Sequence, residues 1–140
     1  MKRQIQLLFY ELHRIFPRFK FWRICRALGI KPYKWQRDYA LGIMERLQYP
    51  AGRATGKTTA VMLRLLMVYP GKPFDVEAIL RADPDFDVTK RGRMWWYDGE
   101  YKRLAHTCAR ANIPVTLRIN IFYLYDYHRT HSYYHYHIGQ

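Results

Sequence analysis

The chain has 140 residues, with 24 Lys and Arg against 11 Asp and Glu, and a formal net charge of +13. Its 13 Tyr, 7 Phe and 4 Trp exclude an intrinsically disordered chain, and the length fits one domain with a hydrophobic core. No apolar run reaches the length of a membrane span and no signal peptide is visible, so we expect no membrane partner and a cytoplasmic location. Two widely separated cysteines, Cys25 and Cys108, favour reduced thiols over a disulfide.

The first half of the sequence predicts helices. Apolar residues at helical spacing predict an amphipathic helix over residues 4–16, which Pro17 closes. The elements predicted next are a helix over 19–28, a helix over 34–48, and a Gly-rich loop that continues into a helix, together spanning residues 51–69.

The second half predicts strands. Residues 76–80 read as a strand, residues 83–87 as a polar loop, and residues 99–112 as a helix with Asp98 as its N-cap. Residues 115–125 alternate apolar and polar side chains, the strongest strand pattern in the chain. We therefore expect an α/β fold, in which N-terminal helices precede a small P-loop-type sheet, complete or incomplete. One domain is predicted over residues 1–126, followed by a Tyr/His-rich tail over 127–140.

The positive charge is uneven along the chain. Residues 1–57 carry 13 Lys and Arg against three acids, whereas residues 58–140 carry 11 against eight. A basic segment of this kind favours a polyanionic partner, most simply nucleic acid. Between Phe16 and Arg23, aromatic side chains alternate with basic ones, a pattern that suits base stacking. The alternative is a set of aromatic core residues with a solvated basic face.

Residues 52–59 read GRATGKTT and resemble a loop that holds phosphate at the start of a helix. Lysine in this position reaches the β- and γ-phosphates, the following threonine hydroxyl binds Mg²⁺, and the helix N-terminus attracts the anion. Only three residues separate the first glycine from Gly-Lys, where the general motif has four, so a Gly-punctuated turn capped by Thr is the alternative. The residues expected to contact the phosphates are Gly52, Arg53, Ala54, Thr55, Gly56, Lys57, Thr58 and Thr59.

The order small residue, Arg, two residues, Gly, Lys, Thr resembles the deviant Walker A motif of the ATPase domain of phage and viral large terminases. In that family a glutamine that contacts adenine precedes the loop, in a segment similar to residues 32–38 here, PYKWQRD, which places the adenine contact on Gln36. The resemblance implies ATP and Mg²⁺ as cofactors, DNA as the partner in packaging or processing, and a homo-oligomer or other phage packaging proteins in the cytoplasm of a bacterial host. It covers roughly residues 30–70.

The resemblance also implies catalytic roles. Arg53 would stabilise developing charge and Lys57 the γ-phosphate, while the Mg²⁺ ligands would be Thr58 and a carboxylate. The family's Asp-Glu pair is absent, so Asp126, at the end of the last predicted strand, is the expected stand-in. The alternative is an Asp that merely starts a turn.

Two further groups of side chains contain residue types that bind metal ions. Asp83, Asp85 and Asp87 could hold a cation, but the Gly and distal Glu of a calcium loop are missing, which favours solvated carboxylates. The four His of the tail could bind zinc, but an aromatic tail is favoured.

Two functions remain open. The first is an ATP-binding protein that acts with DNA and hydrolyses ATP weakly when isolated. The second is a non-enzymatic, basic nucleic-acid-binding or interaction module with a vestigial phosphate loop.

Overall fold

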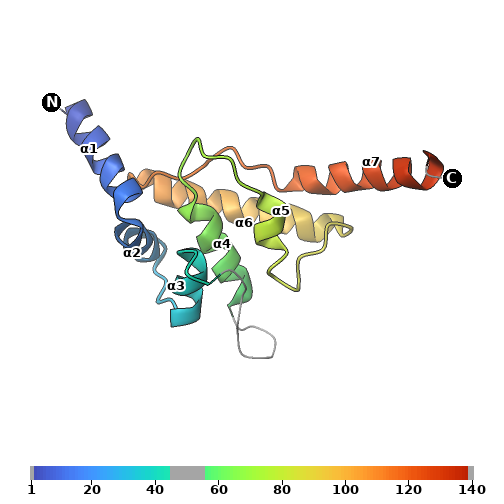
Figure 1. Cartoon of the computed structure of the whole chain (residues 1–140), viewed down its shortest axis with the longest axis horizontal. Helices are drawn as coiled ribbons and strands as arrows, with labels where there is room; N and C mark the ends of the chain where they lie inside the picture. The colour runs from blue at the N-terminus through green and yellow to red at the C-terminus, as the bar shows by residue number, and fades with distance from the viewer. Residues whose placement is uncertain (1, 45–55, 139–140) are drawn as a thin grey trace.

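The computed structural model describes residues 2–44 and 56–138, with side chains as far as Thr130. The elements in this part of the chain are helices (Figure 1). They are α1 (Lys2–Ile15), α2 (Pro17–Leu28), α3 (Lys34–Ala40), α4 (Lys57–Met67), α5 (Val76–Leu80), α6 (Arg91–Arg110) and α7 (Phe122–Ile138).

The expected α/β fold is wrong, because the described residues contain no strand and no sheet. The predicted strand at 76–80 is helix α5 instead. Asp75 acts as its N-cap, with a side-chain oxygen that accepts a hydrogen bond from the backbone N–H of Ala78 at 3.1 Å. A capped helical turn thus outweighs the β propensity of this short apolar run.

The second predicted strand, 115–125, is also wrong, since α7 begins at Phe122 and the preceding residues form no ladder. Two side chains of α6 form hydrogen bonds with this segment's backbone. The Tyr101 hydroxyl donates to the carbonyl of Thr116 at 2.6 Å, and the N–H of Ile121 donates to Asp98 Oδ1 at 2.8 Å. Asp98 is therefore an anchor within α6, which begins at Arg91, and not the predicted N-cap.

Helix α4 lies at the centre of the core. Six of its eleven residues are at most 2% exposed: Ala60, Val61, Met62, Leu63, Leu65 and Leu66. A helix that is apolar on most of its circumference needs cover on several sides, and α2, α3 and α5 pack against it. The start of α4 is therefore held in a defined position relative to its neighbours.

The N-terminal helices follow the prediction closely. Pro17 separates α1 from α2, and Gly29, with a φ of 68°, ends α2 in the left-handed conformation. Helix α3 ends at Ala40, earlier than the predicted residue 48, although residues 45–48 lie outside the described part. Helix α1 stands out from the body (Figure 1), and Arg23 ties its end to α6 by bonding His13 Nε2 at 2.9 Å and the carbonyl of Ala111 at 2.6 Å.

Helix α7 packs on α6 and then continues away from the body (Figure 1). The domain boundary expected between residues 126 and 127 falls inside this helix. None of the described helices combines the length and the apolar character that a bilayer crossing requires.

Candidate functional site

The start of α4 is built around Gly56. This residue has a φ of +86°, which glycine adopts without strain, and Lys57 begins the helix directly after it. A Cβ atom added to Gly56 would lie 2.5 Å from Nε2 of Gln36, closer than any such contact allows. The position thus requires glycine both for its backbone conformation and for the approach of Gln36.

Gln36 connects α3 to the start of α4. Its Nε2 donates to the carbonyl of Gly56 at 3.0 Å, and its Oε1 accepts from the N–H of Tyr33 at 2.9 Å. The side chain is only 4% exposed. One amide hydrogen and one oxygen lone pair therefore remain for any other contact, and the adenine contact stays a prediction.

The structure brings Thr58 together with Asp83. The Thr58 hydroxyl donates to Asp83 Oδ2 at 2.6 Å, and the Tyr97 hydroxyl donates to the same oxygen at 2.6 Å. Oδ1 accepts from the N–H of Asp85 at 3.0 Å. Asp83 is 1% exposed, so the expectation of a solvated loop carboxylate is wrong at this position. A carboxylate needs such bonds when it is removed from water.

The surroundings of Asp83 also act on Tyr97. Burial, together with the hydrogen bond to Asp83, raises the pKa of the Tyr97 phenol well above its usual range. Tyr97 is therefore neutral at physiological pH and stays a hydrogen-bond donor to the carboxylate. Asp83 Oδ2 is thus held by one hydroxyl from α4 and one from α6.

The sequence favoured Asp126 as the Mg²⁺-directing carboxylate and treated Asp83 as a solvated loop residue, whereas the structure places Asp83 beside Thr58. Asp126 is exposed on α7, which Figure 1 shows at the upper right of the molecule, whereas α4 starts near the lower edge of the view. The signal that could have identified Asp83 is the apolar run of residues 76–80, because an aspartate follows it within three residues.

An open cleft of about 580 Å³ adjoins Thr58, here called the Thr58 cleft. Arg93, Trp96 and Tyr97 line it from α6, where their spacing of three and four residues places them on one helix face. Asp85 completes its lining. A second hollow of about 370 Å³ shares Thr58 and Trp96 with the first, and Thr59 also lines it. Trp96, which is 52% exposed, thus borders both hollows beside Thr58.

The remaining predicted phosphate contacts divide between described and undescribed residues. Lys57 is partly exposed at the first position of α4 and Thr59 lies in its first turn. Gly52, Arg53, Ala54 and Thr55 lie outside the described residues.

Among the described side chains, no three His, Cys, Asp or Glu residues gather as a metal-binding group. Mg²⁺ that accompanies a nucleotide needs few protein ligands, since phosphate oxygens and waters supply most of its coordination. The Thr58 hydroxyl and the Asp83 carboxylate are oxygen donors of the type that Mg²⁺ prefers, so these residues fit the ion.

Cys25 and Cys108 are free and buried. Burial raises the pKa of each thiol to about 11, which keeps both protonated at neutral pH. Because the thiolate is the nucleophile, neither cysteine is suited to covalent catalysis.

Comparison with known proteins finds no matching family model, no matching curated protein and no matching solved structure.

Proposed function

We propose that the chain binds ATP with Mg²⁺ at the start of α4. The observation that carries this proposal is the 2.6 Å hydrogen bond from Thr58 to Asp83. A hydroxyl in the first turn of a helix, paired with a buried carboxylate, is the combination with which P-loop NTPases hold Mg²⁺. Thr58 also directly follows Lys57, the residue with the reach and charge for the β- and γ-phosphates.

The hydrogen bond sets the direction of the Thr58 hydroxyl. Because its proton points to Asp83, the oxygen lone pairs remain to face a cation in the Thr58 cleft. The N–H groups in the first turn of α4 lack intrahelical acceptors, and their partial positive charge favours phosphate. Arg93, which lines the same cleft, adds a full positive charge.

The same geometry makes binding depend on the metal ion. Asp83 would bring a negative carboxylate close to the polyphosphate, and the two repel unless a cation lies between them. We therefore expect ATP to bind weakly without Mg²⁺.

Turnover of ATP by the isolated chain is expected to be slow. Hydrolysis needs a group that orients the attacking water, and Pro84 rather than a glutamate follows Asp83. In this proposal the chain acts with DNA in phage-type packaging or processing, and missing catalytic groups come from DNA, from further copies of the chain or from other packaging proteins.

A titration with a fluorescent ATP analogue, with Mg²⁺ and with EDTA, tests the proposal. Wild type should bind only with Mg²⁺, and Lys57→Ala should lose binding because the cation for the β- and γ-phosphates is gone. The control is Lys72→Ala, which removes an exposed lysine elsewhere. Equal affinity in wild type and Lys57→Ala, with unchanged circular dichroism, would refute the proposed site.

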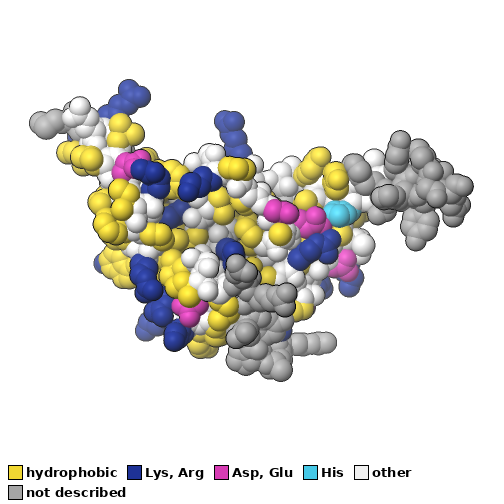
Figure 2. Space-filling view, in the orientation of Figure 1, with side chains coloured by type: hydrophobic (Ala, Val, Ile, Leu, Met, Phe, Trp, Pro, Cys, Tyr) yellow, Lys and Arg dark blue, Asp and Glu magenta, His cyan; other side chains and the backbone are white. Residues whose placement is uncertain are grey.

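The second candidate is a non-enzymatic nucleic-acid-binding module. Figure 2 shows Lys and Arg side chains interspersed with hydrophobic ones around the α2 and α3 end of the molecule. A chain that binds oligonucleotides but no ATP analogue under any Mg²⁺ condition would favour this function over the first.

A further inference from the structure

We infer that a cleft between α2 and α3 binds single-stranded nucleic acid, with one base stacked on Trp22. This inference rests on the proposed nucleic-acid partner and assigns it a surface and a strand form. The cleft, here called the α2–α3 cleft, has a volume of about 480 Å³ and lies apart from the residues that line the Thr58 cleft.

The lining of the α2–α3 cleft combines cations with apolar side chains. Four basic residues line it, namely Arg18, Arg26, Lys31 and Arg37, and no acidic residue does. Asp38 pairs with one of these cations: its Oδ1 lies 3.6 Å from Arg37 Nε, and its side chain is 17% exposed. A concave surface with this charge fits a polyanion, and its phosphate groups in particular.

The apolar part of the cleft explains why a base is needed as well as phosphate. Phe21, Ile30 and Leu41 line it alongside Trp22, which is 53% exposed. The Arg26 guanidinium lies over one face of the Trp22 ring, 5.2 Å from its centroid. A base that stacks here therefore takes the place of the guanidinium on that face or stacks on the guanidinium itself, and in either arrangement a cation lies next to the base. Bases stack on aromatic rings of this kind irrespective of sequence.

Duplex nucleic acid fits this surface less well. Its bases are paired and stacked inside the helix, so it presents phosphates to the cations but no free base to Trp22. The chemistry of the cleft therefore favours an unpaired strand over a duplex.

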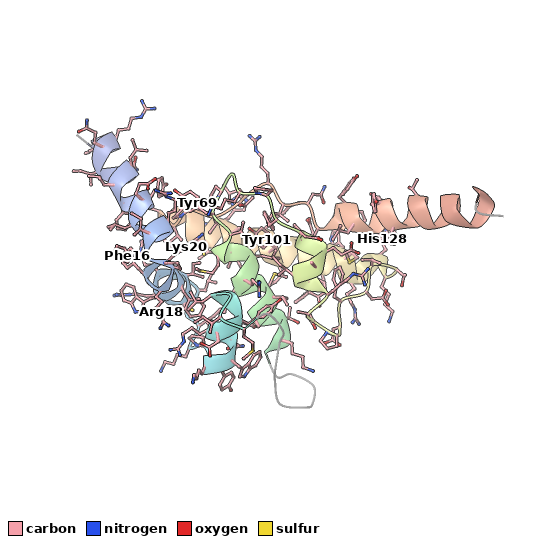
Figure 3. The ribbon with its side chains drawn as sticks, in the orientation of Figure 1. Phe16, Arg18, Lys20, Tyr69, Tyr101 and His128 are labelled. Atoms are coloured by element: carbon pink, nitrogen blue, oxygen red, sulfur yellow. The ribbon has the colours of Figure 1, made fainter. Side chains whose placement is uncertain are left out.

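Tertiary structure sorts the basic residues of α2 into two groups. Arg18 and Arg26 are exposed, whereas Lys20 is 1% exposed and Arg23 bonds the carbonyl of Ala111. In Figure 3, Arg18 lies on the outer side of α2, and Lys20 faces the body near Tyr69. Phosphate contacts from α2 are therefore assigned to Arg18 and Arg26, and not to all four cations.

The experiment measures fluorescence anisotropy of labelled oligothymidylate and of a labelled duplex, over a series of salt concentrations. Wild type should bind the single strand more tightly than the duplex. Trp22→Leu should weaken single-strand binding by about tenfold, because one stacked base is lost. The matched control is Trp95→Leu, which removes an exposed tryptophan on α6, outside the cleft.

A double variant, in which two arginines of the cleft are replaced by neutral glutamines, tests the phosphate contacts. Arg18→Gln/Arg26→Gln should reduce the salt slope, the change of log K with log salt, by about 1.4, since each single-strand phosphate contact contributes about 0.7. Lys72→Gln/Arg118→Gln removes the same charge from exposed positions outside the cleft and should leave the slope unchanged. Thermal unfolding by circular dichroism confirms that each variant is folded.

Three outcomes would overturn the inference. If wild type binds oligonucleotides and the cleft variants bind as tightly as their controls, the surface lies elsewhere. If duplex binds as tightly as single strand, stacking on Trp22 is not used. If wild type binds neither nucleic acid, or binds anionic lipid vesicles instead, the nucleic-acid partner itself is wrong.

Discussion

The hydroxyl of Thr58 donates to Oδ2 of Asp83 across 2.6 Å, joining the first turn of α4 to a loop 25 residues later in the chain. Asp83→Asn replaces one carboxylate oxygen by an NH₂ group, which cannot accept from Thr58 and Tyr97. We expect the free energy of unfolding to fall by about 1–3 kcal/mol, measured by urea denaturation. Binding of the ATP analogue with Mg²⁺ should be lost at the same time.

Asp126→Asn is the matched control for Asp83→Asn. Asp126 is exposed on α7, so its replacement should change neither stability nor nucleotide binding. If Asp126→Asn abolishes binding while Asp83→Asn does not, the carboxylate for the metal ion has been assigned to the wrong residue.

Trp96 borders both hollows beside Thr58, so we expect a bound nucleotide to contact this ring. Trp96→Leu should weaken binding of ATP by about tenfold, because stacking of a base on an aromatic ring is lost. It should leave binding of inorganic tripolyphosphate unchanged, since that ligand has no base. Isothermal titration calorimetry measures both affinities.

Trp95→Leu is the control for the nucleotide contact, because Trp95 packs edge-on against Phe122 of α7 instead. Equal ATP affinity in the two tryptophan variants would show that the base lies elsewhere. Gln36, with one amide hydrogen and one lone pair still available, would then be the next residue to replace.

Gly56→Ala is predicted to destabilise the protein for two separate reasons. Its φ of +86° is strained for alanine, and the new Cβ would lie 2.5 Å from Nε2 of Gln36. Gly71→Ala separates the two effects, because Gly71 has a φ of +91° and open space around its Cβ position. Chemical denaturation should show a loss of about 1 kcal/mol for Gly71→Ala and a larger loss for Gly56→Ala.

A double substitution isolates the contact between the two residues. Removing the amide in Gly56→Ala/Gln36→Ala relieves the clash, so the combined loss should be smaller than the sum of the single losses. Strict additivity would mean that Gln36 does not approach Gly56 as described.

Lys20 is predicted to make stability depend on pH. Its Nζ donates to the carbonyls of Met67 and Val68 at the end of α4, and burial lowers its pKa from 10.5 to about 8. Between these two values the unfolded state binds more protons than the folded state, so stability rises with pH. Above pH 8, Lys20 should raise the free energy of unfolding by about 1 kcal/mol per pH unit. Below pH 8, Lys20 should contribute no change with pH.

The measurement compares wild type with Lys20→Met by urea denaturation from neutral pH to about pH 9.5. The free energy of unfolding of wild type should increase relative to that of Lys20→Met as pH rises. Burial raises the pKa of Cys25 and Cys108, so their titration has the opposite sign in both proteins. The Lys20 charge lowers the Cys108 pKa, so its removal in Lys20→Met raises that pKa and shifts the difference in the same direction as Lys20 itself. A difference that stays constant across this range would contradict a depressed Lys20 pKa.

Local signals in the sequence predicted helices α1 and α2 and the start of α4 well, but not α5, the start of α6 or α7. Helices α1 and α2 follow from apolar residues at helical spacing and from the stops at Pro17 and Gly29, which act on their immediate neighbours. The start of α4 near Lys57 was likewise predicted, from the glycine before it and the helix formers after it. The strand predictions failed because a strand needs a partner strand elsewhere in the chain, and the backbone of Thr116 and Ile121 bonds to α6 side chains instead.

The amino-acid sequence by itself determined the net charge, the helix boundaries set by Pro and Gly, and the presence of a lysine and a threonine at the start of α4. Only the tertiary structure decided that Asp83, and not Asp126, meets Thr58, and that Lys20 turns inward while Arg18 stays in water. The physical reason is the same in both cases. Burial and long-range hydrogen bonds depend on which helices cover α4, and no local pattern along the chain specifies that arrangement.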